Sequence, residues 1–304
     1  MHVTILGAGA FGTALASVLK TNNHLVSFYD PQKYPDLSLE SALRSAEVII
    51  FAAPSSAAPA LLAAIPRSAH SLPLILASKG FWSLAPFEDI FGDNLSLLSG
   101  PAFATNLKKH QNSSFTTTSP LPRQLLSAPF LSFDSTSDRL GVALCGTLKN
   151  IYAIFAGLVH LKQGTNDCRT FINYSLREIK SILRANSCDP ATADLACGYG
   201  DLSLTATSPA SRNYQYGASL NPKDPPKSTH STAEQSSEKP QIANRGEKNS
   251  IRPRSKVPQN PPTLEGLSAL KSLASSEIII PKNLKIFNTI LERTSHDRNQ
   301  TPTS

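Results

Sequence analysis

Paired spacings for metal ligands and disulfides are absent from this sequence. Its four cysteines, Cys145, Cys168, Cys188 and Cys197, show no CxxC spacing, and its seven histidines form no HExxH or HxxxH pair. Zinc sites and disulfide frameworks depend on such spacings. We therefore expect no metal site and no disulfide-stapled fold.

The sequence also lacks a segment for membrane insertion or export. The N-terminal "MHVTILGAGA" begins directly with a predicted strand and has neither a basic region nor a signal-type apolar run. No stretch reaches the roughly 18 unbroken apolar residues that a membrane-spanning helix needs. We expect a soluble, cytoplasmic protein with no membrane span.

The positive charge of the chain is concentrated in one tract. The net charge is +7, and residues 218–262 hold eight Lys and Arg against four acidic residues, eight of the 23 prolines and no aromatic residue. A low-complexity tract of this kind is predicted to be disordered. Scattered charge without aromatic side chains for base stacking does not favour nucleic-acid binding. We expect no nucleic-acid partner.

The first hundred residues alternate short apolar runs with segments of helical composition. The runs 2–6, 24–29, 47–52, 72–78 and 95–99 are predicted as strands. Apolar strands that alternate with helices predict a parallel sheet covered on both faces. From about Gly141 the pattern turns helical, with an amphipathic helix predicted over 169–186. We predict an α/β protein with a parallel-sheet domain at 1–140 and an all-helical domain at 141–304.

A glycine-rich turn follows the first predicted strand. In "VTILGAGAFGTALA", Gly7 allows a tight turn, Gly9 lets a pyrophosphate approach the backbone, and Gly12 lets the next helix pack on the strand. Asp30 ends the second predicted strand, where its carboxylate can bind a ribose 2′-hydroxyl and repel a 2′-phosphate. This arrangement predicts a Rossmann-type domain that binds NAD in preference to NADP; the alternative is a structural glycine turn with a surface aspartate.

Two further motifs follow predicted strands. "ASKGF" (77–81) puts Lys79 just past the carboxyl end of one strand, and "LSGPAFA" (98–104) repeats the arrangement one strand later. Ligands of open α/β sheets bind at this edge. Taken alone, Lys79 fits a solvated loop lysine better than a ligand-binding residue.

A single lysine interrupts the apolar stretch "ALCGTLKNIYAIFAGLVHL" (143–161). A buried lysine charge is costly unless it is paired or takes part in chemistry, so Lys149 is a candidate general acid/base. Further on, "GYGDLSLTATSPASRN" (198–213) contains Asp201, Thr205, Arg212 and Asn213, and the forked donors of arginine suit a phosphate. Taken singly, Asp201 also fits a helix N-cap and Arg212 a surface charge.

With these motifs together, the chain resembles the bacterial form of NAD(P)-dependent glycerol-3-phosphate dehydrogenase. The motifs "GAGAFGTALA", "SKG", "LSGPAFA", "GTLKN" and "GYGDLSLTATSPASRN" occur in the order of that family, and the likeness resumes at "TLEGL" (263–267). The resemblance implies reduction of dihydroxyacetone phosphate to sn-glycerol 3-phosphate with NAD(P)H, which would supply glycerol phosphate for phospholipid synthesis. It also implies a homodimer.

The resemblance assigns roles to individual residues. It implies that Lys149 protonates the carbonyl oxygen, that Asp201 holds its ammonium group, and that Lys79 adds a second positive charge. The implied substrate-binding residues are Lys79, Gly100, Ala102, Lys149, Asn150, Asp201, Thr205, Ser211, Arg212 and Asn213. The implied cofactor-binding residues are Gly7, Gly9, Ala10, Phe11, Gly12, Asp30, Lys79, Ala104, Arg212 and Glu265.

An alternative function rests on departures from the family pattern. Ala102 stands where the family often has Ser or Thr, and the tract 218–262 replaces a region that is helical in the family. These departures suit a catalytically impaired nucleotide-binding relative in which the basic tract mediates an interaction. The retained Lys149, Asp201, Arg212 and Asn213 favour an active dehydrogenase.

Overall fold

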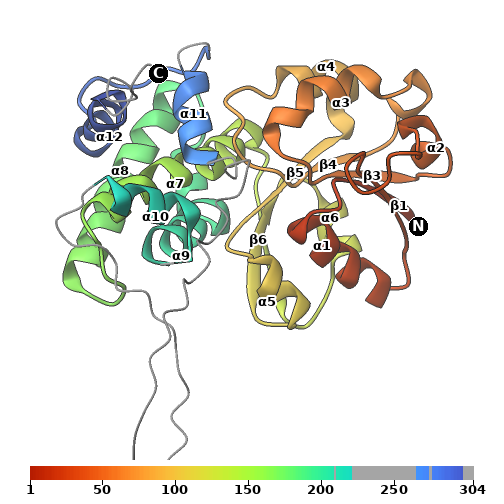
Figure 1. Cartoon of the computed structure of the whole chain (residues 1–304), viewed down its shortest axis with the longest axis horizontal. Coiled ribbons are helices and arrows are strands. Elements are labelled where there is room, and N and C mark those ends of the chain that lie inside the picture. Colours follow the sequence, from red (N-terminus) through yellow and green to blue (C-terminus); the bar gives the residue numbers. More distant parts are fainter. Residues whose placement is uncertain (209, 221–264, 274–275, 297–304) are drawn as a thin grey trace, which may run out of the picture.

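The structure is a computed structural model that describes residues 1–208, 210–220, 265–273 and 276–296, and it has two parts (Figure 1). The strands are β1 (His2–Leu6), β2 (Leu25–Tyr29), β3 (Val48–Phe51), β4 (Leu74–Leu76), β5 (Leu95–Ser99), β6 (Ser113–Thr117) and β7 (Leu131–Ser135). The α-helices are α1 (Ala10–Thr21), α2 (Leu39–Leu43), α3 (Ala58–Ala64), α4 (Ala85–Phe91), α5 (Ala104–Lys108), α6 (Pro120–Leu125), α7 (Arg139–Leu158), α8 (Asn166–Ala185), α9 (Asp201–Thr207), α10 (Arg212–Ser219), α11 (Glu265–Leu273) and α12 (Lys285–His296). Short helical turns are η1 (Ser55–Ala57), η2 (Arg67–Ala69), η3 (Gly92–Asn94), η4 (Pro190–Asp194) and the π-helical η5 (Ala196–Gly200).

The seven strands form one sheet in the order β2-β1-β3-β4-β5-β6-β7. Neighbouring strands run parallel except β5 and β6, which are antiparallel. Because β1 and β3 to β5 point the same way, their carboxyl ends meet at one edge. The motifs after β1, β4 and β5 therefore lie along a common edge, as the sequence predicts.

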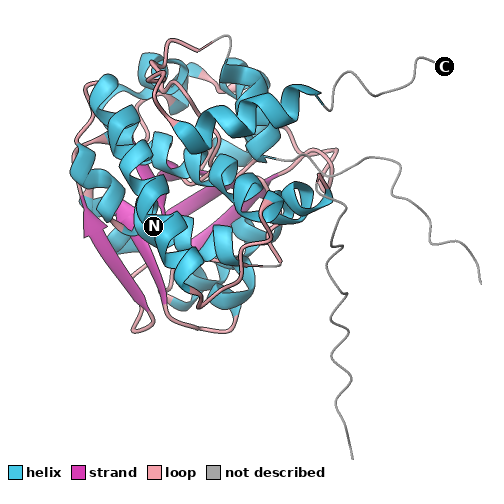
Figure 2. Cartoon of the chain, turned by 90° about the vertical axis from the view of Figure 1, so that its left-hand side faces the viewer, coloured by secondary structure: helices cyan, strands magenta, loops and turns pink. Residues whose placement is uncertain are grey.

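Helices cover both faces of the sheet, as apolar strands require. Helices α2, α3 and α4 pack on one face, and α1, α5 and α6 pack on the other (Figure 1). Viewed from the helical domain, helices surround the strands (Figure 2). The core on the α2–α4 face continues into the helical part, since residues of α7, α8 and α12 belong to the same apolar cluster.

Helix α7 is the centre of the helical part. It begins at the N-cap Asp138, whose Oδ1 accepts a hydrogen bond from Gly141 N at 2.9 Å, and nearly all of its residues are buried. It is long and apolar enough to cross a membrane by length and composition alone. Its burial against α9, α10, α11 and α12 instead makes it the core helix of this domain.

The predicted fold class is confirmed, with differences in detail. Strands β6 and β7 extend the sheet where no strand was predicted, and the amphipathic helix begins at Asn166 and ends at Ala185. Ala218 and Ser219, the first residues of the predicted disordered tract, form the last turn of α10, and Ala218 is buried. Leu220 follows in a turn, and residues 221–262 lie outside the described residues.

Candidate active site

The glycine-rich turn between β1 and α1 has the shape that a dinucleotide needs. Gly7 has φ +107°, and a Cβ there would lie 2.7 Å from Ala53 N. A Cβ on Gly12 would lie 2.1 Å from the Gly7 carbonyl oxygen, so the helix packs directly on the turn. At Gly9 a Cβ would meet nothing within 4 Å. The open side of the turn is thus over Gly9, at the N-terminus of the 12-residue helix α1, where the helix dipole favours a phosphate.

Asp30 lies beside this turn, directly after β2. Its Oδ2 accepts a hydrogen bond from Ala8 N at 2.9 Å, and its Oδ1 accepts one from Gln32 N at 3.1 Å. Lys33 donates a hydrogen bond to the Ala8 carbonyl oxygen. The carboxylate is therefore fixed next to the glycine-rich turn, which fits the position where it would meet an adenosine ribose. The residues of this turn fit NAD(P).

Three charged side chains meet between the sheet and the helical part. Lys149 Nζ lies 3.3 Å from Asp201 Oδ1, and Lys79 forms an ion pair with Asp201 Oδ2. Asp201 is 1% exposed and Lys149 is 8% exposed. Each carboxylate oxygen thus faces one lysine, and the burial makes these pairs stronger than surface ion pairs.

Neutral groups complete this cluster. Lys149 Nζ donates to Thr205 Oγ1 at 3.0 Å, Thr205 Oγ1 donates to Asp201 Oδ1 at 3.4 Å, and Lys79 Nζ donates to the Gly100 carbonyl oxygen at 3.1 Å. Two lysines share one carboxylate, so the cluster has an excess of positive charge. Such a site attracts an anion or an oxygen atom on which negative charge develops.

A second set of polar contacts lies one residue further along α7. Asn213 Nδ2 donates to Asn150 Oδ1 at 3.1 Å, and Asn213 Oδ1 accepts from Gly266 N at 3.0 Å. Asn213 follows Arg212, which is exposed at the first position of α10. Ser211 caps the same helix through a hydrogen bond from Tyr214 N at 3.3 Å. The structure gives the Ser211 hydroxyl this capping role, in addition to its predicted role in substrate binding.

The structure therefore brings the predicted residues together in groups. Lys79, Gly100, Lys149, Asp201 and Thr205 form one network, and Asn150 and Asn213 form the next. The isolated interpretations of Lys79 as a solvated loop lysine and of Asp201 as an N-cap are wrong, because both side chains are paired and Gly200 is the N-cap of α9.

The remaining predicted residues lie on the edge of the sheet or on α11. Ala10 and Phe11 open α1, and Ala104 opens α5. Ala102 N donates to the Gly100 carbonyl oxygen at 2.9 Å, which closes the turn after β5. Glu265 is the first residue of α11, but its side chain lies outside the described residues.

Sequence reasoning missed a polar residue at this edge. Ser99 is the last residue of β5 and is buried, and its Oγ has no hydrogen-bond partner in the structure. A Cβ on Gly146 would lie 3.2 Å from Ser99 Oγ and 3.4 Å from Lys79 Cγ, so the hydroxyl lies beside the lysine cluster. Its place at the end of a predicted strand, directly before Gly100, was the available signal.

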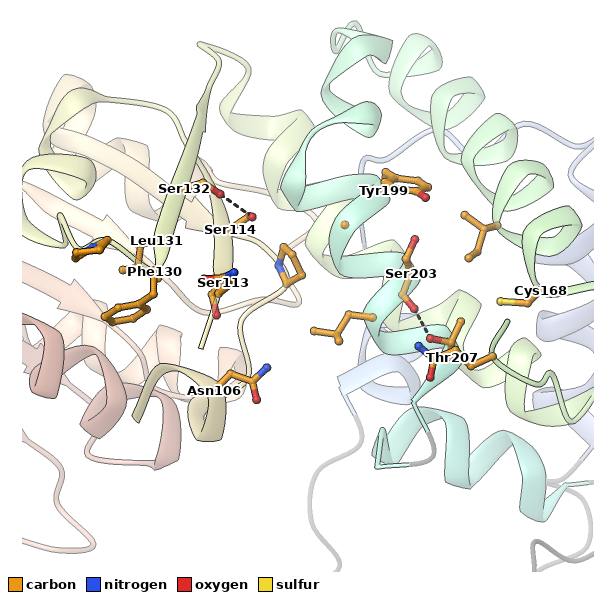
Figure 3. Close-up of a pocket in the computed structure, with 17 residues that line it drawn as sticks. Asn106, Ser113, Ser114, Phe130, Leu131, Ser132, Cys168, Tyr199, Ser203 and Thr207 are labelled. Carbon is orange, nitrogen blue, oxygen red and sulfur yellow. Dashed lines mark hydrogen bonds between the residues drawn. The ribbon is translucent and has the colours of Figure 1, made fainter. Parts of the chain in front are cut away.

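A cleft of about 750 Å³ separates the two parts of the molecule beside the cluster (Figure 3). Ser113, Ser114 and Ser132 line it from the β6–β7 side, and Tyr199 and Ser203 line it from the helical side. It reaches Pro101 and Gly200, the sequence neighbours of Gly100 and Asp201. None of the described side chains that line it is charged, so a phosphate is better placed near the cations Arg212, Lys79 and Lys149 than in this cleft.

The chain matches family models in both of its parts. The model described as the C-terminus of NAD-dependent glycerol-3-phosphate dehydrogenase matches residues 138–252, and the model for the N-terminus matches residues 2–34. The glycerol-3-phosphate dehydrogenase [NAD(P)+] of Pseudomonas savastanoi is 31% identical over 258 residues, which are 72% of this chain and 75% of that protein. The enzyme of the same name from Nitrosomonas eutropha is 32% identical over 72% of this chain and 79% of its own length.

Solved structures share the fold. The glycerol-3-phosphate dehydrogenase of Coxiella burnetii superposes with a TM-score of 0.62 at 22% sequence identity. The match covers 72% of this chain and 79% of the Coxiella burnetii chain. The glycerol-3-phosphate dehydrogenase of Plasmodium falciparum superposes with a TM-score of 0.67 at 15% sequence identity. The match covers 100% of this chain and 96% of the Plasmodium falciparum chain. The sequence identity to the curated relatives, together with this fold, establishes that the chain belongs to the NAD-dependent glycerol-3-phosphate dehydrogenase family.

Proposed function

We propose that this chain reduces dihydroxyacetone phosphate to sn-glycerol 3-phosphate with NAD(P)H, and that the product serves phospholipid synthesis. The observation that carries the proposal is the buried cluster in which Lys79 and Lys149 share Asp201 beside the edge of the sheet. The curated relatives bear the name of this enzyme. NAD(P)H, when bound, supplies the hydride that reduces the ketone.

Lys149 has the role of general acid in this reduction. Negative charge develops on the ketone oxygen as the carbonyl is reduced, and the ammonium group at Lys149 Nζ both stabilises that charge and donates the proton. Asp201 Oδ1 at 3.3 Å and Thr205 Oγ1 at 3.0 Å fix the position of Nζ. In the reverse direction, neutral Lys149 takes the proton from the hydroxyl group. Asp201 acts in this scheme through Lys149, because its carboxylate holds the ammonium group in place.

The phosphate of the substrate is assigned to the start of α10. Arg212 offers forked donors there, and Asn213 next to it offers an amide whose orientation is fixed by two hydrogen bonds. The eight-residue helix also directs the positive end of its dipole toward this position. Lys79, paired to Asp201 and bonded to Gly100, adds positive charge between the phosphate and the ketone.

The glycine-rich turn and Asp30 support the assignment of the cofactor. Backbone N–H groups at the start of α1 would hold the pyrophosphate over Gly9, where the turn is open. Asp30 beside Ala8 favours NADH because its carboxylate would face a 2′-phosphate at close range. A homodimer, implied by the resemblance, and a cytoplasmic location, expected from the sequence, stay predictions.

An assay of NADH oxidation with dihydroxyacetone phosphate tests the function. The wild-type chain should consume NADH only when the substrate is present. Lys149→Ala should lower kcat by about 100- to 10,000-fold, as is typical when a general acid is removed, while NADH binding stays intact. Lys162→Ala is the matched control, because Lys162 is exposed in the loop after α7.

The outcome separates the proposal from the alternative. A wild-type chain that binds NADH without turnover would favour the catalytically impaired relative, in which the basic tract 218–262 carries the function. If the wild-type enzyme is active and Lys149→Ala lowers kcat by less than tenfold, the general-acid role of Lys149 is contradicted, but the proposed function is not.

A further inference from the structure

Helix α11 contacts both sides of the candidate active site. Its Gly266 N donates to Asn213 Oδ1 at 3.0 Å, and its Ala269 carbonyl oxygen accepts a hydrogen bond from Trp82 Nε1 at 2.8 Å. Trp82 is 5% exposed and lies three residues after Lys79 in the loop that follows β4. In the fold, α11 lies on the side of the helical domain that faces the sheet (Figure 1). One helix therefore links the Lys79 loop to Asn213.

The contact at Gly266 leaves no room for a side chain. A Cβ there would lie 2.7 Å from the Asn150 carbonyl oxygen and 2.9 Å from Asn213 Oδ1. Both distances are below 3.0 Å, which real Cβ atoms essentially never show, and one of the atoms belongs to the backbone of the buried helix α7. Glycine at this position is what lets the backbone of α11 approach the Asn213 amide.

The hydrogen bond from Gly266 determines which end of the Asn213 side chain faces a ligand. With Oδ1 bonded to Gly266 N and Nδ2 bonded to Asn150 Oδ1, rotation of the amide by half a turn would break both bonds. A side-chain amide has two N–H donors, and Asn150 takes one. The second stays available for a phosphate oxygen next to Arg212.

We propose that α11 is part of the substrate site of this enzyme, with Gly266 as a positioning residue that orients Asn213 for the substrate phosphate and with Trp82 as the contact that keeps α11 against the Lys79 loop. This inference rests on the proposed function. It assigns roles to two residues that touch neither the substrate nor the cofactor.

Gly266→Ala is the first test, with Ser268→Ala on the same helix as its control. Moving α11 away from Asn213 should weaken binding of the phosphate in the ground state and the transition state alike. The KM for dihydroxyacetone phosphate should then rise about tenfold, equivalent to one hydrogen bond to a charged group, with kcat within about threefold. Ser268 is half-buried on the same helix, and its variant should match the wild type.

Trp82 reports the position of the helix directly, because it is the only tryptophan of the chain. In Gly266→Ala its emission should shift to longer wavelength as water reaches the indole. Trp82→Phe adds no bulk and removes the N–H that binds Ala269 together with part of the buried indole ring, so it is the second variant if Gly266→Ala does not fold. It should raise the same KM about fivefold, since one hydrogen bond is worth on the order of 1 kcal/mol.

The kinetic pattern decides between positioning and mere packing. A fall in kcat with an unchanged KM in Gly266→Ala or Trp82→Phe would overturn the proposal, because it would mean loss of folded enzyme rather than of phosphate binding. An unchanged KM together with shifted Trp82 emission would overturn it as well. An inactive wild-type chain would refute the proposed function itself. That result comes from the wild-type protein, so it is distinguished from the results on the variants.

Discussion

Replacing Asp201 with asparagine tests the charge arrangement on which the candidate site depends. Asp201 is 1% exposed, and each of its oxygens faces a lysine, Lys149 Nζ at 3.3 Å and Lys79 on the other side. Asparagine keeps the size of the side chain and removes its charge. The two lysine cations, one buried and one partly exposed, would then lose the carboxylate that they share.

The expected loss of stability follows from what each lysine retains. Breaking a buried ion pair by removing one partner costs about 3–5 kcal/mol. Lys79 keeps the Gly100 carbonyl oxygen at 3.1 Å, and Lys149 keeps Thr205 Oγ1 at 3.0 Å. Because these neutral acceptors offset part of the loss, we expect Asp201→Asn to lower the free energy of unfolding by about 3 kcal/mol at pH 7. Without Asp201 to hold Lys149, kcat should fall by about 100-fold or more.

Denaturant unfolding and steady-state kinetics measure the two effects. Asp194→Asn is the matched control, since Asp194 pairs with Lys180 at 2.7 Å but its side chain is 56% exposed, and exposed pairs contribute less than about 1 kcal/mol. Adding Lys79→Met to Asp201→Asn should recover part of the stability, because it removes one of the two unbalanced charges. If Asp201→Asn were no less stable than Asp194→Asn, the carboxylate would not be balancing two cations.

Three further predictions follow from other contacts. Asp30→Ser should raise the ratio of kcat/KM for NADPH to that for NADH by about tenfold, because it removes a negative charge beside the ribose; an unchanged ratio would mean that Asp30 does not face the 2′ position. Glu178→Ala should lower the free energy of unfolding by about 2–4 kcal/mol, since the carboxylate accepts hydrogen bonds from Tyr152 Oη at 3.0 Å, Ile286 N at 2.9 Å and Phe287 N at 3.1 Å. The exposed Glu292 on α12 provides the control, and an equal effect of Glu292→Ala would contradict this. The free energy of unfolding should fall as the pH rises from about 9 toward 12. Burial raises the pKa of Cys188 from 9.0 to about 12, the hydrogen bond that the Cys145 thiol donates to Cys197 together with burial raises the pKa of Cys145, and burial raises the pKa of Tyr152. The folded state then keeps protons that the unfolded chain has released, so this stability is complete below pH 9 and is lost above it. Unfolding curves that do not change between pH 9 and pH 11 would contradict the prediction.

The strands that could be predicted are the apolar ones, β1 to β5, and they include the partly exposed edge strand β2. Strands β1 and β3 to β5 are almost wholly apolar, and the sequence alone located them to within a few residues. Strands β6 and β7 were missed because they are rich in Ser, Thr and Asp. Those polar side chains fasten the helical part to the sheet: Thr116 Oγ1 accepts from Cys197 N at 2.9 Å, and Asp134 Oδ2 accepts from Ala196 N at 2.8 Å. A strand that uses its side chains in this way does not show the apolar pattern of a buried strand.

Residue spacing predicted the candidate site only where the residues that form it are close together in the sequence. The roles of Gly7, Gly9 and Gly12 follow from one turn, so spacing was sufficient. Asp201 lies 52 residues from Lys149 and 122 from Lys79, and no spacing rule joins them. Their meeting was expected from the family resemblance alone. Trp82 and Gly266 were not singled out, because each contact joins a backbone group to a side chain of a distant segment.

The position of Lys149 also explains why a lysine is tolerated on a helix that is buried nearly all round. Consecutive residues on a helix point about 100° apart, so Lys149 and Asn150 face different neighbours of α7. Lys149 meets Asp201 and Thr205 of α9, and Asn150 meets Asn213 of α10. The groups that compensate for burying the lysine are thus the groups that hold it where a ketone oxygen would be protonated. A substitution at Asp201 cannot weaken catalysis without also destabilising the packing of α9 against α7, and for that reason stability and turnover should be lost together in Asp201→Asn.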